Sequence, residues 1–71
     1  MNEKQMCEAI VRLYDWICSE RHHYLDMWET TEDEGMKTYY GEKTSTYTSI
    51  KLYLSKYLGG VISVGKRQEK H

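Results

Sequence analysis

The stretch that decides the fold is residues 6–28, which read MCEAIVRLYDWICSERHHYLDMW. Apolar residues recur there every three or four positions, the spacing of one helix face, so we predict a long amphipathic helix over residues 1–30. Asn2 followed by Gln5 is typical of a capping box at the start of such a helix. We expect the helix to give way after Trp28 to an acidic turn over residues 31–35, in which Gly35 supplies the backbone freedom.

The apolar arc of this predicted helix is unusually wide. It covers roughly 200° of the circumference, against about 100° for a helix that lies on one core. So wide an arc must be covered by the rest of the chain, by a second copy or by a partner protein. We therefore expect a dimer or partner interface at seven residues: Met6, Ile10, Leu13, Trp16, Ile17, Tyr24 and Trp28.

Size and composition favour reinforcement by association. The chain of 71 residues predicts one small domain, near the lower limit for a self-sufficient core, and only 39% of it is apolar. It has seven Tyr and two Trp but no Phe, and a Tyr ring can be buried while its hydroxyl stays hydrated, which suits interfaces.

The two cysteines and the lack of membrane signals bear on location. Cys7 and Cys18 would lie roughly 16 Å apart along one helix, too far for a disulfide within the chain. We see no signal-peptide pattern and no apolar run long enough to span a bilayer. We therefore expect a cytoplasmic protein with no membrane contact.

The second half of the chain admits two interpretations. Residues 36–58 are rich in Tyr and Lys, and the Thr/Tyr segments 36–40 and 44–48 around Gly41 are typical of a small β-hairpin. From Ser45 onward the apolar spacing favours a helix, with Gly59 directly after its end. We favour a mainly α fold, with a shorter C-terminal helix that folds back and a small β-hairpin as an optional element before it; α+β is the alternative. Residues 61–64 would form a short strand, and residues 65–71 a basic, mobile tail.

Charge is distributed unevenly along the chain. Residues 1–35 carry three basic and nine acidic side chains, whereas residues 36–71 carry seven basic and two acidic ones. The densest acidic patch, five carboxylates within nine residues, is a candidate for binding a basic groove of a partner protein. Its members are Asp26, Glu29, Glu32, Asp33 and Glu34. The competing structural interpretation, which the pattern favours, is a solvated turn or a patch that neutralises Lys51 and Lys56 in a folded-back hairpin.

The basic half suggests a different class of partner. Cations beside stacking rings are typical of single-stranded nucleic-acid binders. The residues that would form such a surface are Lys37, Tyr39, Tyr40, Lys51, Tyr53, Lys56 and Tyr57. The positive charge of this half is modest, however, and no known nucleic-acid motif accompanies it.

No pattern of residues predicts catalysis or a cofactor. Residues 60–67 approach the phosphate-binding pattern G-x4-G-K-[ST], but Arg67 stands where the magnesium-binding hydroxyl is needed. Cys18, His22 and Asp26 share a helix face, yet two or three ligands on one helix do not close a tetrahedral zinc site. No nucleophile can be placed against His22 and His23. We therefore expect no enzyme, no metal, no cofactor and no small-molecule substrate.

The leading hypothesis is a small non-catalytic regulatory protein, an inhibitor or adaptor, that binds another protein and forms a homodimer. The competing hypothesis is a regulator that binds nucleic acid through its Lys/Tyr-rich half. Size alone suggests an origin in a phage or mobile element.

Overall fold

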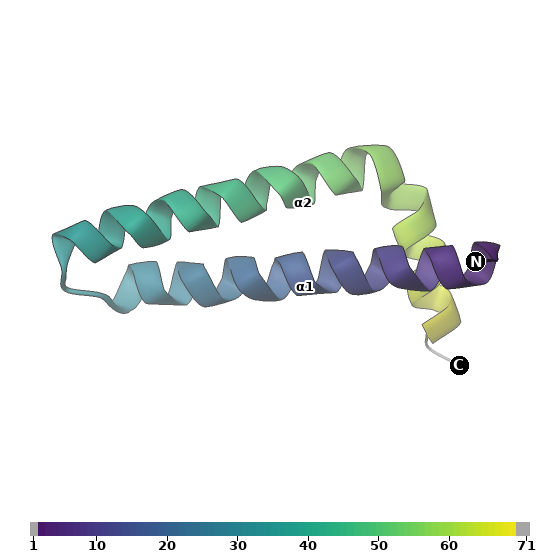
Figure 1. The fold of residues 1–71 in the computed structure, drawn as a ribbon, viewed down its shortest axis with the longest axis horizontal. Coiled ribbons are helices and arrows are strands. Elements are labelled where there is room, and N and C mark those ends of the chain that lie inside the picture. The colour runs from purple at the N-terminus through teal and green to yellow at the C-terminus, as the bar shows by residue number, and fades with distance from the viewer. Residues whose placement is uncertain (1, 70–71) are drawn as a thin grey trace.

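The chain folds as a hairpin of two long helices. The computed structural model describes residues 2–69, with side chains for residues 2–65. Helix α1 spans Glu3–Thr30 and helix α2 spans Glu34–Glu69, and the two lie side by side and antiparallel (Figure 1). No strand occurs in this part of the chain, so the mainly α class is confirmed. The expected β-hairpin at residues 36–48 and the strand at residues 61–64 are wrong, because both segments lie within α2.

Helix α1 begins as the sequence predicts. The backbone amide of Gln5 donates to the Asn2 side chain at 2.8 Å, and the amide of Asn2 donates to the Gln5 side chain at 3.0 Å. This reciprocal pair is the expected capping box. At the other end, Thr31 is extended and its amide donates to the carbonyl of Met27 at 2.9 Å.

The turn between the helices is shorter than predicted. Between the two helices only residues 31–33 are non-helical, and α2 starts at Glu34. The Asp33 carboxylate accepts a hydrogen bond from the amide of Met36 at 2.9 Å, which caps the new helix. Gly35 therefore lies in the first turn of α2, and no glycine in residues 2–69 has a positive φ. The expectation that Gly35 provides turn flexibility is wrong.

Helix α2 forms although threonine and tyrosine are modest helix formers. Threonine hydroxyls bond back to the carbonyl four residues earlier, as Thr44 does to Tyr40 at 2.8 Å and Thr48 does to Thr44 at 2.7 Å. Packing along α1 supplies the remaining stabilisation. With 36 residues, α2 is longer than the 28-residue α1, so the prediction of a shorter second helix is wrong. The helix also continues through Gly59 rather than ending there.

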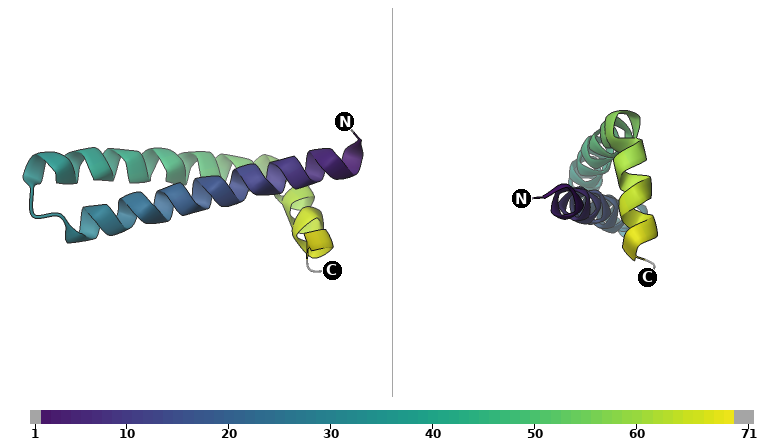
Figure 2. Two further views of the ribbon diagram at one scale, coloured as in Figure 1. Left: turned by 60° about the horizontal axis from the view of Figure 1, so that its bottom comes forward. Right: turned by 90° about the vertical axis from the view of Figure 1, so that its right-hand side faces the viewer.

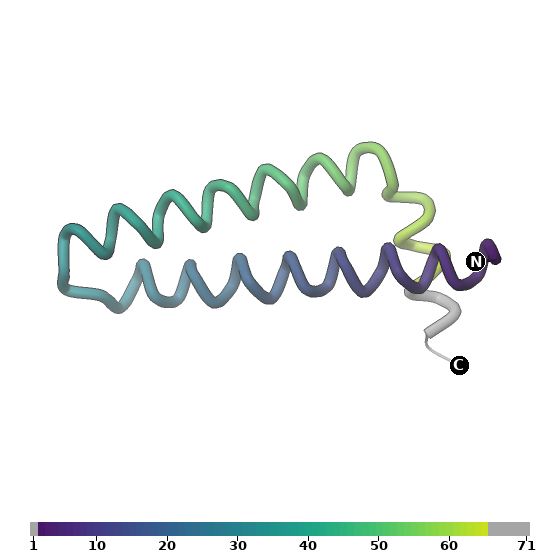
Figure 3. The backbone as a smooth tube through the Cα atoms, viewed as in Figure 1, coloured from purple at the N-terminus to yellow at the C-terminus, as the bar shows by residue number. Residues whose placement is uncertain are grey.

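Helix α2 bends sharply around residue 60 and then crosses α1 near its N-terminus (Figures 1, 2 and 3). The adjacent pair Gly59 and Gly60 lies in this region, and glycine pairs are a common cause of helix kinks. The segment after the bend, residues 60–69, is called the crossing segment below.

The crossing segment closes the core at the open end of the hairpin. Val11 of α1 is fully buried and Ile62 of the crossing segment is 6% exposed. Gly65 is also buried, and a Cβ atom added to it would collide with Val11 Cγ2 and lie 3.3 Å from the carbonyl oxygen of Cys7. Absence of a side chain at this position therefore lets the two helices approach closely. The predicted mobile tail over residues 65–71 is wrong for its helical part, residues 65–69; residues 70–71 lie outside the described residues.

Candidate protein-binding surfaces

Part of the predicted interface stripe on α1 is occupied by α2. Ile17 is only 3% exposed and Ile10 is half-buried. The Tyr24 ring stacks on Tyr47, with ring centroids 5.7 Å apart and planes at 10°. In this fold, Ile17 and much of Tyr24 are therefore unavailable to a second chain.

Tyr24 is the centre of an aromatic cluster between the helices. Its ring centroid lies 6.3 Å from that of Tyr39 and 6.2 Å from that of Tyr40. Burial raises the pKa of Tyr24 above its ordinary value, and the phenols of Tyr39 and Tyr47 add to the effect because their ionised forms would repel it. The cluster therefore favours the neutral phenol of Tyr24, and its ring contacts join α1 and α2 in the half of the hairpin nearer the turn.

Trp28 borders an apolar depression near the turn. The Lys37 ammonium lies 4.5 Å from the centroid of the Trp28 ring, in position for a cation–π interaction. The indole edge rests against Gly41, where an added Cβ would lie 3.2 Å from Trp28 Nε1. Beside it is an open depression of about 320 Å³, lined by Leu25, Trp28, Gly41, Thr44 and Ser45.

Four of the seven predicted interface residues remain exposed: Met6, Leu13, Trp16 and Trp28, of which Trp28 borders the depression near the turn. The first three are grouped here with three exposed side chains of α2. All six side chains are between 38% and 64% exposed. We call this set the aromatic edge: Met6, Leu13 and Trp16 of α1 with Ile50, Tyr53 and Tyr57 of α2.

Helix geometry and one ring contact place the α1 members and the α2 members of the aromatic edge on the same side of the hairpin. Steps of 7 or 11 residues return to nearly the same direction on a helix, so Leu13 is in line with Tyr24 on α1, and Ile50 is in line with Tyr39 on α2. The contact between Tyr24 and Tyr39 joins these two sets of residues. Trp16 lies edge-on to Tyr47 at 6.0 Å, which bridges the helices at the same side.

The crossing segment explains why this side stays uncovered. It packs on Val11 and Cys7, and Val11 points about 160° away from Leu13 around α1. One flank of the wide apolar arc is thus covered by the chain itself. The other flank, with Leu13 and Trp16, is left at the surface.

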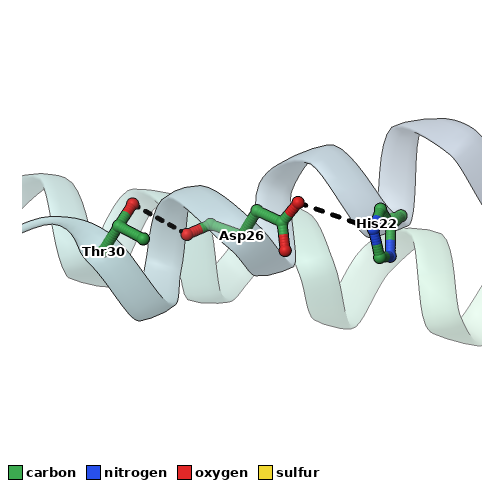
Figure 4. Close-up of polar contacts among 3 residues, drawn as sticks. All are labelled: His22, Asp26 and Thr30. Carbon is green, nitrogen blue, oxygen red and sulfur yellow. Dashed lines mark hydrogen bonds and ion pairs between the residues drawn. The ribbon is translucent and has the colours of Figure 1, made fainter.

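The five predicted acidic residues gather at the turn end of the hairpin. All five are exposed, and we call them the acidic tip: Asp26, Glu29, Glu32, Asp33 and Glu34. Asp26 pairs with His22, whose Nε2 lies 3.5 Å from the carboxylate, and the Thr30 hydroxyl donates to the Asp26 carbonyl at 2.8 Å (Figure 4). Lys51 lies 17 residues beyond Glu34, about 26 Å along α2. It is therefore too distant to neutralise the tip within one chain.

The predicted nucleic-acid surface does not form one continuous groove. Tyr53 and Tyr57 belong to the aromatic edge, with Lys56 5.4 Å from the Tyr57 ring centroid. Lys51 is half-buried and points about 160° away from Tyr53 around α2. Tyr40 packs on Tyr24 and Lys37 on Trp28, so these two side chains have partners inside the hairpin.

Other candidate chemistry finds little support in the described part of the chain. Cys7 and Cys18 are free thiols. No three His, Cys, Asp or Glu side chains among the described residues are arranged to hold a metal ion. Neither α1 nor α2, as far as they are described, has an apolar stretch sufficient to cross a lipid bilayer.

The sequence reasoning missed two residues that shape these surfaces. Gly65 was assigned to a tail, although it directs the crossing segment onto Val11. Ile50 was not singled out as a candidate interface residue, and a helical register counted from Glu34 would have aligned it with Tyr39. The chain matches no protein-family model, no curated protein and no solved structure.

Proposed function

We propose that this chain is a small non-catalytic regulatory protein, of the inhibitor or adaptor type, that binds another protein through its acidic tip. The observation that carries the proposal is the apolar depression next to the exposed carboxylates. Carboxylates alone attract any cation, whereas an adjacent apolar depression can also receive a side chain of a protein partner.

The geometry of the depression and the tip supports a proposal for the chemistry of the partner. Leu25 lines the depression, and Glu29, four residues later, is its neighbour on the surface of α1. A volume of about 320 Å³ accommodates one large apolar side chain. The partner would therefore present a basic surface with a protruding aliphatic or aromatic residue, and charge attraction would accelerate its association.

Affinity capture from the native host tests the proposal with a matched pair of variants. Glu29→Lys/Glu32→Lys reverses two charges at the tip and spares the Asp33 cap. Glu3→Lys/Glu42→Lys reverses two exposed charges elsewhere. We expect one protein to be captured by the wild-type chain and the control but lost from the tip variant. Equal capture by both variants would contradict a role for the tip.

A second candidate function, nucleic-acid binding, rests on two contacts along α2. Lys43 lies 5.6 Å from the Tyr39 ring centroid and Lys56 lies 5.4 Å from that of Tyr57, so cations accompany exposed rings on α2. Mobility-shift titrations with DNA and RNA at about 50 and 200 mM salt test this function, because counterion release makes such binding fall steeply with salt. Absence of a shift at both concentrations excludes it.

The free thiols of Cys7 and Cys18 are compatible with a reducing compartment, and we propose a cytoplasmic location on that basis.

A further inference from the structure

We propose that the aromatic edge is the surface at which two copies of this chain pair, with their hairpins antiparallel about a two-fold axis. The pairing would create a four-helix assembly with an acidic tip at each end. It uses a different surface from the acidic tip, so it stands or falls independently of the function proposed above.

The exposed apolar area matches what a stable dimer needs. The six side chains of the aromatic edge are about half exposed. A fully buried aromatic side chain contributes about 150–250 Å². The exposed parts of the six side chains therefore sum to roughly 500–600 Å² per copy. A stable interface of standard size buries about 800 Å² per partner, of which about 56–65% is apolar, or roughly 450–520 Å². The aromatic edge therefore supplies the whole apolar part of such an interface.

The position of the aromatic edge along the hairpin sets the level of the two-fold axis. Its residues come from both α1 and α2, and the Trp16–Tyr47 contact places Trp16 level with the Ile50 region. A two-fold axis at this level brings each copy's Trp16 and Ile50 near the same pair of the other copy, as an isologous interface requires. Antiparallel helix pairs packed in this way form the common four-helix bundle.

Charge selects the antiparallel orientation. Residues 20–46, the half of the hairpin that contains the acidic tip, carry seven acidic and three basic side chains, a net charge of −4. The other described side chains, in residues 2–19 and 47–65, carry three acidic and four basic groups, a net charge of +1. A parallel pair would place the two acidic halves together, whereas an antiparallel pair places each beside the slightly basic half of the other copy.

Sedimentation equilibrium of the whole chain and two exposed-site variants tests the surface. Tyr53→Glu places a charge within the aromatic edge, and Leu52→Glu places the same charge at an equally exposed neighbour about 100° away. We expect the wild type and Leu52→Glu to be dimers, and Tyr53→Glu to raise the dimer Kd about 30-fold or more, as loss of a central contact does. Circular dichroism confirms that each variant stays helical.

Spin labels at the tip test the orientation. In a Cys7→Ala/Cys18→Ala background, a label at Glu32→Cys is 16 residues from the level of Trp16, about 24 Å along the helix. An antiparallel dimer then separates the two labels by about 48 Å, and a parallel dimer brings them within about 25 Å. A wild-type monomer at about 1 mM, equal effects of Tyr53→Glu and Leu52→Glu, or the short label distance would each overturn the proposal.

Discussion

Replacing Gly65 by alanine adds one methyl group where the crossing segment meets α1. The new Cβ would collide with Cγ2 of Val11, a fully buried side chain, and would also approach the carbonyl oxygen of Cys7 at 3.3 Å. Overpacking of this kind costs about 1–3 kcal/mol. Alanine recovers about 1 kcal/mol because it is the better helix former. We therefore expect Gly65→Ala to lower the free energy of unfolding by up to about 2 kcal/mol.

Gly60→Ala is the matched control for this prediction. It makes the same chemical change in the same helix, but nothing lies within 4 Å of the added Cβ. Gly60 lies at the bend of α2, but its φ is not positive, so alanine can adopt the same backbone conformation. Only the helix preference remains, and this variant should gain up to about 1 kcal/mol. The two variants should thus differ by about 1–3 kcal/mol in urea unfolding. Each kcal/mol corresponds to a melting-temperature difference of about 4–8 °C for a domain of this size.

A double-mutant cycle identifies the contact itself. Val11→Ala alone removes buried methyl groups and should destabilise the fold by about 1.5–3 kcal/mol. In Gly65→Ala/Val11→Ala the methyl group at position 65 occupies the vacated space, so the double variant should be more stable than the sum of the single changes by about 1–2 kcal/mol. Equal stability of Gly65→Ala and Gly60→Ala, with no coupling to Val11, would refute the packing of the crossing segment.

Three further predictions concern the cap, the helix–helix hydrogen bond and the aromatic cluster. Asp33→Ala removes the acceptor of the Met36 amide and should cost about 1 kcal/mol in urea unfolding, whereas the neighbouring Glu32→Ala should change stability by less than about 0.5 kcal/mol. Arg21 Nε donates to the Thr48 hydroxyl at 2.7 Å, so Thr48→Val should cost about 0.5–1.5 kcal/mol in the same assay, because it removes this part-buried hydrogen bond while water can still reach the guanidinium. The pKa of Tyr24 is raised from 10.0, so the folded state holds this proton more tightly than the unfolded state does. The contribution of this pKa shift to the free energy of unfolding is complete below pH 10.0 and is lost as the pH rises through the folded pKa. Tyr24→Phe should therefore weaken the loss of stability at alkaline pH. An unchanged dependence of the free energy of unfolding on pH would contradict the raised pKa.

The position and start of α1 followed from local sequence. The capping box of Asn2 and Gln5 and the apolar repeat of residues 6–28 act over three to seven positions, so they can be recognised without knowledge of the rest of the fold. The acidic tip was also predictable, since its residues are close in sequence and fall at a turn.

The helix in the middle of the chain was only partly predictable. Segments rich in Thr and Tyr favour strands by propensity, and the competing apolar spacing indicated a helix only from Ser45 onward. In the structure, Thr44 and Thr48 bond back along the helix, and Tyr40 and Tyr47 pack on Tyr24. Contacts with α1 thus override a weak local preference.

The sequence by itself determined that α1 has more apolar circumference than one neighbour can cover. Which flank is covered was decided only by tertiary structure, because it depends on the bend of α2 and on the contact between Gly65 and Val11, 54 positions apart in the chain. Periodicity reports the direction of a side chain from its own helix axis, but it carries no information about which distant segment arrives there. The close approach allowed by a missing Cβ at Gly65 settles that choice and leaves Leu13 and Trp16 at the surface.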